Sequence, residues 1–201
     1  MKKGTIILLV VIAVFVVIAL SLFGWYTSTY NNLVSLDEGV KGSWSQVENQ
    51  YQRRFDLIPN LVNTVKGVAN FEKETYTAVT EARAKVGQVQ INANDLDNPA
   101  KFQQFQAAQE NLSGALSRLL VTVENYPQLK ANENFLSLQT QLEGTENRIS
   151  VERRKFNQTV QSYNTKIKQF PTNFVASMSG FNEKQYFQAA AGSDQAPNVE
   201  F

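Results

Sequence analysis

The residues best suited to chemistry form a polar cluster around a proline inside a stretch with helical spacing. Its members are Arg53, Arg54, Asp56, Pro59, Asn60, Glu146 and Arg153. Proline removes one backbone hydrogen bond from a helix and commonly kinks it, so polar groups there can face a gap. We favour the interpretation that the cluster is a polar lock that fixes the register between two helices. The alternative is a polar pocket at the kink that recognises an anionic group through its guanidinium groups.

Catalysis and metal binding find little support in the residue types. The chain contains no histidine and no cysteine, which removes the commonest general base and the commonest soft metal ligands. Di-metal centres of helical bundles need Glu-x-x-His motifs, which this chain lacks. Glu143 and Glu146 share a helix face, but Arg148 lies close by, so ion pairing is the favoured role. We therefore predict no enzyme activity, no metal site and no cofactor.

Charge argues against nucleic acid as a partner. The whole chain has a formal net charge of +1, and without Lys2 and Lys3 the remainder has −1. A surface that binds nucleic acid or anionic lipid needs clustered Lys and Arg. We expect the polar surface to contact protein.

An uninterrupted apolar run over residues 6–23 must be placed before any other element. A helix needs roughly 17–25 apolar residues to cross a bilayer, whereas the apolar part of a cleavable signal is typically ~7–15 residues long. Trp25, Tyr26 and Tyr30 follow it, where an aromatic belt at the membrane interface is expected. The run predicts an uncleaved signal anchor over residues 6–26.

The positively charged residues predict its orientation. Lys2 and Lys3 precede the run, and the first basic residue after it is Lys41. Positive residues stay on the cytoplasmic side, so residues 1–5 are expected in the cytoplasm and the remainder outside it. The expected parts are this short N-terminus, the anchor, a helical domain over 27–187 and a disordered tail over 188–201.

Apolar spacing predicts four helices after the anchor. They are expected over residues 30–68, 71–88, 99–126 and 132–170, with an N-cap at Asn70 for the second and a polar loop over 89–98. The first and last are much longer than the others. Short connections make sequential neighbours antiparallel, so the fold class is all-α: a transmembrane helix followed by an up-down-up-down four-helix bundle.

The two long helices are expected to pair with residue numbers that sum to about 200. This register sets Trp44 against Phe156 and Arg54 against Glu146. A shift of one heptad pairs the apolar residues nearly as well, so the ion pairs select the register. Apolar stripes left uncovered on the long helices would mark contacts between copies, which predicts a homo-oligomer.

The fourth helix must return toward the membrane, with Phe170 near Trp25 and Tyr30. The apolar residues over 174–187 that follow it can rest on the bilayer or cover the end of the bundle. We favour the second because Lys184 is the only basic residue in that segment. Either arrangement shields Phe181 from water.

Several motifs resemble those of the LemA family. They are RRxDLIPNLVxxVKG over residues 53–67, TENRI over 145–149, RxxFNxxVxxYN over 153–164, WSQ over 44–46 and YPxLKA over 126–131. Phe55 departs from the family, in which many members have histidine there, so a metal or acid–base role at that position does not apply. The resemblance implies a bacterial single-pass protein of the inner membrane with a helical bundle, and no assigned reaction.

Three functional hypotheses remain. The favoured one is a membrane-anchored scaffold or interaction protein that assembles with itself or with other envelope proteins. The alternative is a ligand-sensing extracytoplasmic domain. Such a domain would have to signal through a partner, because very few residues precede the anchor. An enzyme comes third.

Overall fold

The computed structural model describes residues 3–68 and 71–189, and this part of the chain is all-α, without a strand. The elements are α1 (Lys3–Lys66), α2 (Lys73–Gln88), the 3₁₀ turn η1 (Ala93–Asp95), α3 (Pro99–Val123), α4 (Pro127–Lys130), α5 (Glu133–Lys168) and α6 (Thr172–Ser179). The predicted all-α class is confirmed. The N-cap predicted at Asn70 and residues 190–201 of the disordered tail predicted over 188–201 lie outside the described residues.

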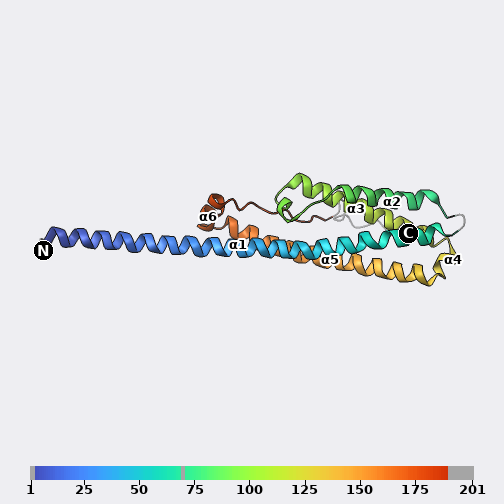
Figure 1. Cartoon of the computed structure of the whole chain (residues 1–201), viewed down its shortest axis with the longest axis horizontal. Coiled ribbons are helices and arrows are strands. Elements are labelled where there is room, and N and C mark those ends of the chain that lie inside the picture. Colours follow the sequence, from blue (N-terminus) through green and yellow to red (C-terminus); the bar gives the residue numbers. More distant parts are fainter. Residues whose placement is uncertain (1–2, 69–70, 190–201) are drawn as a thin grey trace, which may run out of the picture.

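Helix α1 is one unbroken helix that contains both the apolar run and the first helix of the bundle (Figure 1). The sequence predicted that the bundle helix begins near Tyr30, but no residue between 24 and 30 stops the helix. Pro59 lies inside α1, and the helix continues past it to Lys66. The apolar residues of its inward face are buried: Leu33, Val40, Trp44, Val47, Tyr51, Ile58 and Val62.

Far from the apolar run, α1, α2, α3 and α5 pack around one apolar cluster. Ile58 and Leu61 of α1, Val79 of α2, Leu119 of α3 and Leu142 of α5 all belong to it. The chain direction alternates from each of these helices to the next (Figure 1). Asn98 and Asn132 cap α3 and α5 by accepting hydrogen bonds from backbone N–H groups of the first turn.

Helices α1 and α5 pair in the predicted register. The rings of Trp44 and Phe156 have centroids 5.6 Å apart, and Arg54 Nη1 lies 2.7 Å from Glu146 Oε1. Both pairs have residue numbers that sum to 200, which excludes the register shifted by one heptad. The fourth helix was predicted to end at Phe170, but α5 ends at Lys168 and the backbone is extended at Gln169. Phe170 lies beyond the helix and is 79% exposed.

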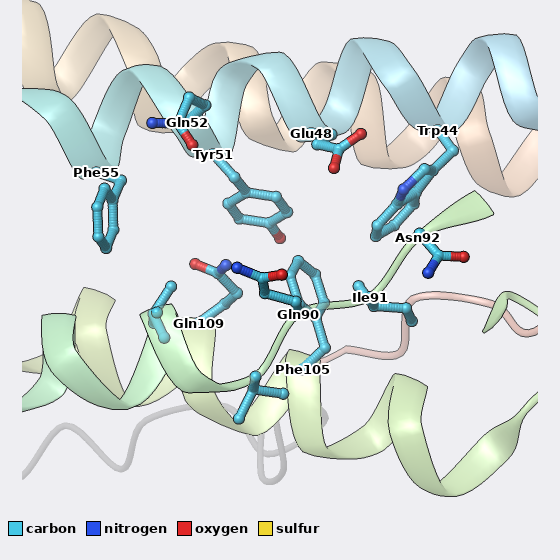
Figure 2. A pocket seen from close by; sticks show the side chains of 13 residues that line it. Trp44, Glu48, Tyr51, Gln52, Phe55, Gln90, Ile91, Asn92, Phe105 and Gln109 are labelled. Carbon is cyan, nitrogen blue, oxygen red and sulfur yellow. The ribbon is translucent and has the colours of Figure 1, made fainter. Parts of the chain in front are cut away.

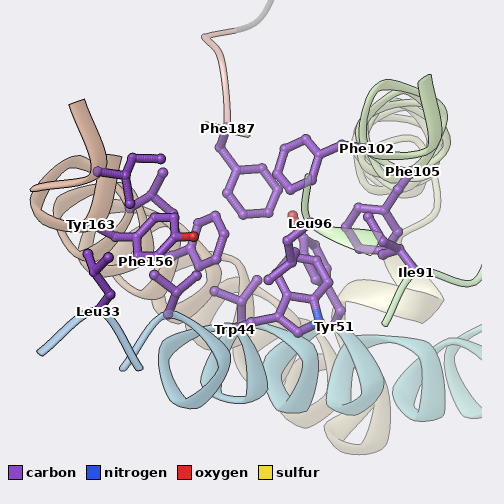
Figure 3. Packing of buried hydrophobic residues seen from close by; sticks show 14 of the residues in the cluster. Leu33, Trp44, Tyr51, Ile91, Leu96, Phe102, Phe105, Phe156, Tyr163 and Phe187 are labelled. Atoms are coloured by element: carbon purple, nitrogen blue, oxygen red, sulfur yellow. The ribbon is translucent and has the colours of Figure 1, made fainter. Parts of the chain in front are cut away.

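At the end of the bundle nearest the apolar run, extended chain replaces the fourth helix. Helix α2 ends at Gln88, and the loop after it contributes Ile91 and Leu96 to a second apolar cluster. The extended segment over residues 181–189 crosses the same region and buries Phe187 among Trp44, Phe102 and Phe156 (Figure 3). The sequence predicted that the apolar residues over 174–187 cover the end of the bundle, and Phe187 does pack on it. It did not predict that residues 181–189 form an extended segment or that Phe187 enters the core.

Helix α6 lies against α1 at the point where the apolar run ends. Tyr26 Oη and Ser179 Oγ are 3.3 Å apart, and the rings of Tyr30 and Phe181 have centroids 5.8 Å apart. Gly180 follows the helix with a φ of 75°, a left-handed conformation that favours glycine. The sequence predicted Phe170 near Trp25 and Tyr30, and the ring contact with Tyr30 is made by Phe181.

Candidate functional site: Arg54 and the adjacent groove

Arg54 is a buried cation that joins three helices. Its side chain projects from α1, is 2% exposed, and donates from Nη1 to Glu146 Oε1 of α5 and to Ser113 Oγ of α3, each at 2.7 Å. Nη2 donates to Gln109 Oε1 of α3. The guanidinium also lies 5.1 Å from the centre of the Tyr51 ring. Both terminal nitrogens of the guanidinium are bound to protein groups, as expected of a polar lock, whereas the buried Nε has no hydrogen-bond partner among the described residues.

The other members of the predicted cluster do not join it. Arg53, Asp56 and Asn60 are exposed, and Asp56 accepts a 2.8 Å hydrogen bond from Gln52 on its own helix. Pro59 is partly buried. Arg153 lies elsewhere: its Nη2 donates to the carbonyl of Gln188 at 3.1 Å, and its guanidinium lies over the ring of Phe187. Of the predicted cluster, the structure brings together only Arg54 and Glu146.

An open groove of about 460 Å³ lies beside Arg54, between α1, the start of the α2–α3 loop and α3 (Figure 2). Its aromatic residues are Trp44, Tyr51, Phe55 and Phe105, and its amide residues are Gln52, Gln90, Asn92 and Gln109. Glu48 is the only charged residue that lines it. Gln109 belongs to both the groove and the Arg54 cluster. The volume is in the range of small-ligand sites.

The side chains of the groove can stack against flat groups and exchange hydrogen bonds with them. They do not include a nucleophile paired with a general base. Trp44 Nε1 is buried and has no hydrogen-bond partner among the described residues. Burial raises the pKa of Tyr51, which keeps its hydroxyl protonated at neutral pH. Figure 2 shows this ring directed from α1 toward the loop that carries Gln90.

Two asparagines on α5 hold the extended segment, and sequence reasoning missed them as functional residues. Asn157 donates to the Phe187 carbonyl and accepts from the Phe187 N–H, each at 2.9 Å. Asn164 makes the same pair of 2.9 Å bonds with the backbone of Lys184. Seven residues of helix rise about 10.5 Å, close to the roughly 10 Å that three extended residues span, so the two spacings match. The available signal was a pair of asparagines one heptad apart, each following a buried aromatic residue.

Further contacts anchor the same segment. Tyr163 donates to the Asn182 carbonyl at 3.0 Å, and burial raises the pKa of Tyr163, so the hydroxyl remains a donor. Gln106 of α3 accepts from the N–H of Gln188 and donates to its carbonyl. Gln188, which the sequence assigned to a disordered tail, is therefore bound to both α3 and α5 through Gln106 and Arg153.

Comparisons with known proteins agree with the motifs. The sequence model of the LemA family matches residues 43–201. The chain is 26% identical to magnetosome protein MamQ 2 of Paramagnetospirillum magneticum over 96% of this chain and 76% of that protein. It is 27% identical to protein LemA of Metamycoplasma hominis over 82% of this chain and 71% of that protein. The match covers the α1–α5 ion pair, the groove and the extended segment, and the chain belongs to the LemA family.

Proposed function

We propose that this protein is a membrane-anchored helical interaction protein of the LemA type. It crosses a bacterial inner membrane once, with residues 1–5 in the cytoplasm and the bundle outside. Its role is to present the bundle, and whatever the bundle binds, at a fixed place on the membrane surface. Membership of the family and the apolar start of α1, which is long enough to cross a membrane, support the anchorage. Lys2 and Lys3 support the orientation.

The continuity of α1 carries this proposal. The helix that is exposed over the apolar run becomes the central helix of the bundle without a loop between them. A flexible linker would let a tethered domain move independently of its anchor. A continuous helix instead couples the orientation of the bundle to that of the span, which suits a scaffold.

The polar interior supports a structural role over a catalytic one. The described residues contain no group of three or more metal-binding side chains. Arg54 is the one charged residue among the buried side chains of the described chain, and its partners belong to the fold. The open groove beside Arg54 is a concave surface of the described chain whose amide side chains can form further hydrogen bonds.

Copies of this protein assemble with one another in this proposal. The sequence predicted uncovered apolar stripes along α1 and α5, but α6 and the extended segment pack against these helices near the apolar run. The span and the outer face of α6 remain as groups of exposed apolar side chains in the described chain, whereas Val121, Leu136 and Val151 are exposed on other parts of the bundle. Contacts between copies would then form in or next to the membrane.

Mass measurement of the full chain, extracted with its lipids, tests the interaction role. A chain has a mass of 22.6 kDa, and we expect particles that contain more than one protein chain. Analysis of the chains in the particle separates copies of this protein from other envelope proteins. Particles with a single protein chain at every concentration would contradict the proposal.

That contrary result would favour the second candidate, a ligand-sensing domain that signals through a partner. The observation in its favour is the groove, which combines aromatic walls with the unpartnered Trp44 Nε1. The groove lies on α1, so a ligand bound there would contact the helix that enters the membrane.

A further inference from the structure

Helix α6 has an exposed apolar face with no cover in the described chain. Phe170, Phe174 and Met178 are 79%, 59% and 81% exposed. Phe174 and Met178 are four residues apart on α6, which puts them on one side of the helix. Phe170 precedes the helix, and its ring makes edge contact with that of Phe174, with centroids 5.8 Å apart. Such a group of large apolar side chains marks a contact surface.

The opposite face of α6 holds it firmly on the bundle. Thr172, Val175 and Ala176 are buried, and the last two belong to the cluster that contains Trp44. The helix contains no charged residue. Docking of the outer face therefore requires no charge on α6 to leave water.

The position of α6 relative to the span identifies what covers the exposed face. Ser179 Oγ lies 3.3 Å from Tyr26 Oη, and Tyr26 is three residues beyond the end of the apolar run at Phe23. Three helical residues rise about 4.5 Å. Interfacial helices bury one face ~5–10 Å into the boundary between headgroups and acyl chains, so α6 lies at that depth when residues 6–23 span the bilayer. Figure 1 shows α6 at the end of the bundle that faces the exposed part of α1.

We propose that α6 is a second membrane contact, which rests on the lipid surface and inserts Phe170, Phe174 and Met178 among the lipids. This inference rests on the proposed membrane anchorage. A single span leaves an attached bundle free to rotate about the span axis and to tilt. A second contact on α6, beside that axis, fixes which side of the bundle faces the bilayer.

The absence of cysteine from the chain allows a direct test with single labels. The full chain is reconstituted in phosphatidylcholine–phosphatidylglycerol vesicles, with a polarity-sensitive fluorophore at Met178→Cys and lipids that carry a nitroxide quencher. Val121→Cys on α3, where the native side chain is 70% exposed, is the water reference, and Phe15→Cys is the reference within the span. We expect strong quenching at position 178, close to that at position 15, and little at position 121.

The outcomes separate this inference from the proposed function. If the label at position 15 is quenched and the label at position 178 is quenched no more than that at position 121, the lipid contact is overturned and the anchorage stands. A crosslink between the cysteines introduced at position 178 of two copies, without quenching by lipid, also overturns the lipid contact. That result would assign the exposed face of α6 to a second copy. The absence of quenching at position 15 contradicts the anchorage itself, and the inference fails with it.

Discussion

Replacement of Phe187 by alanine is expected to lower the free energy of unfolding by about 3–5 kcal/mol, the usual cost of truncating a buried phenylalanine. The side chain is 6% exposed, and its ring centroid lies 5.0 Å from that of Phe102 and 5.5 Å from that of Phe156. It also stacks on Trp44 at 6.0 Å. Its loss opens a cavity in the membrane-proximal core and removes the main apolar contact of the extended segment.

The adjacent residue provides the matched control. Tyr186 belongs to the same segment but is 40% exposed, so Tyr186→Ala is expected to cost about 1 kcal/mol or less. Urea unfolding of the full chain in detergent micelles, followed by circular dichroism, measures both variants. Equal effects of the two substitutions would show that the segment does not hold Phe187 in the core.

Removal of the Glu146 carboxylate is expected to cost about 3 kcal/mol, the lower end of the range for breaking a buried ion pair. Glu146→Ala leaves the Arg54 guanidinium, 2% exposed, without its counter-charge. The Glu146 side chain is 40% exposed, and water that enters there keeps the loss of stability at the lower end of this range. Glu143→Ala is the control, because Glu143 is exposed and accepts a hydrogen bond only from Gln139 on its own helix.

A double-mutant cycle isolates the pair. Arg54→Met removes the buried charge and leaves Gln109 and Ser113 without their donor, at an expected cost of about 1–2 kcal/mol. In that background, Glu146→Ala is expected to cost less than about 0.5 kcal/mol, because no buried cation remains to be neutralised. Equal costs of Glu146→Ala in both backgrounds would contradict the polar lock.

The helices and their pairing could be predicted because both depend on repeated spacing. Apolar residues at intervals of three and four fix which face of α1 is buried, and the buried positions from Leu33 to Val62 follow that pattern. The pairing of Arg54 with Glu146 followed from the same register. The burial of Arg54 could not be predicted in this way, because spacing alone does not show which of two adjacent arginines faces inward.

The extended segment could not be predicted because it has no repeat. Phe187 is buried in a backbone conformation set by side-chain amides of distant helices, and neither hydrophobic periodicity nor turn chemistry encodes such contacts. The groove is also a product of tertiary structure. It exists because α2 ends at Gln88 and the loop after it takes a different path along α1.

The most direct test of the central claim is the distance across the junction between the span and the bundle. Val17→Cys and Ser35→Cys carry spin labels at exposed positions on one face of α1, because eighteen residues complete five helical turns. In lipid nanodiscs, double electron–electron resonance of the full chain should give a narrow distribution near ~27 Å, the rise of eighteen helical residues. A broad distribution, or one with a much shorter centre, would show that the anchor and the bundle are joined flexibly and would contradict the account.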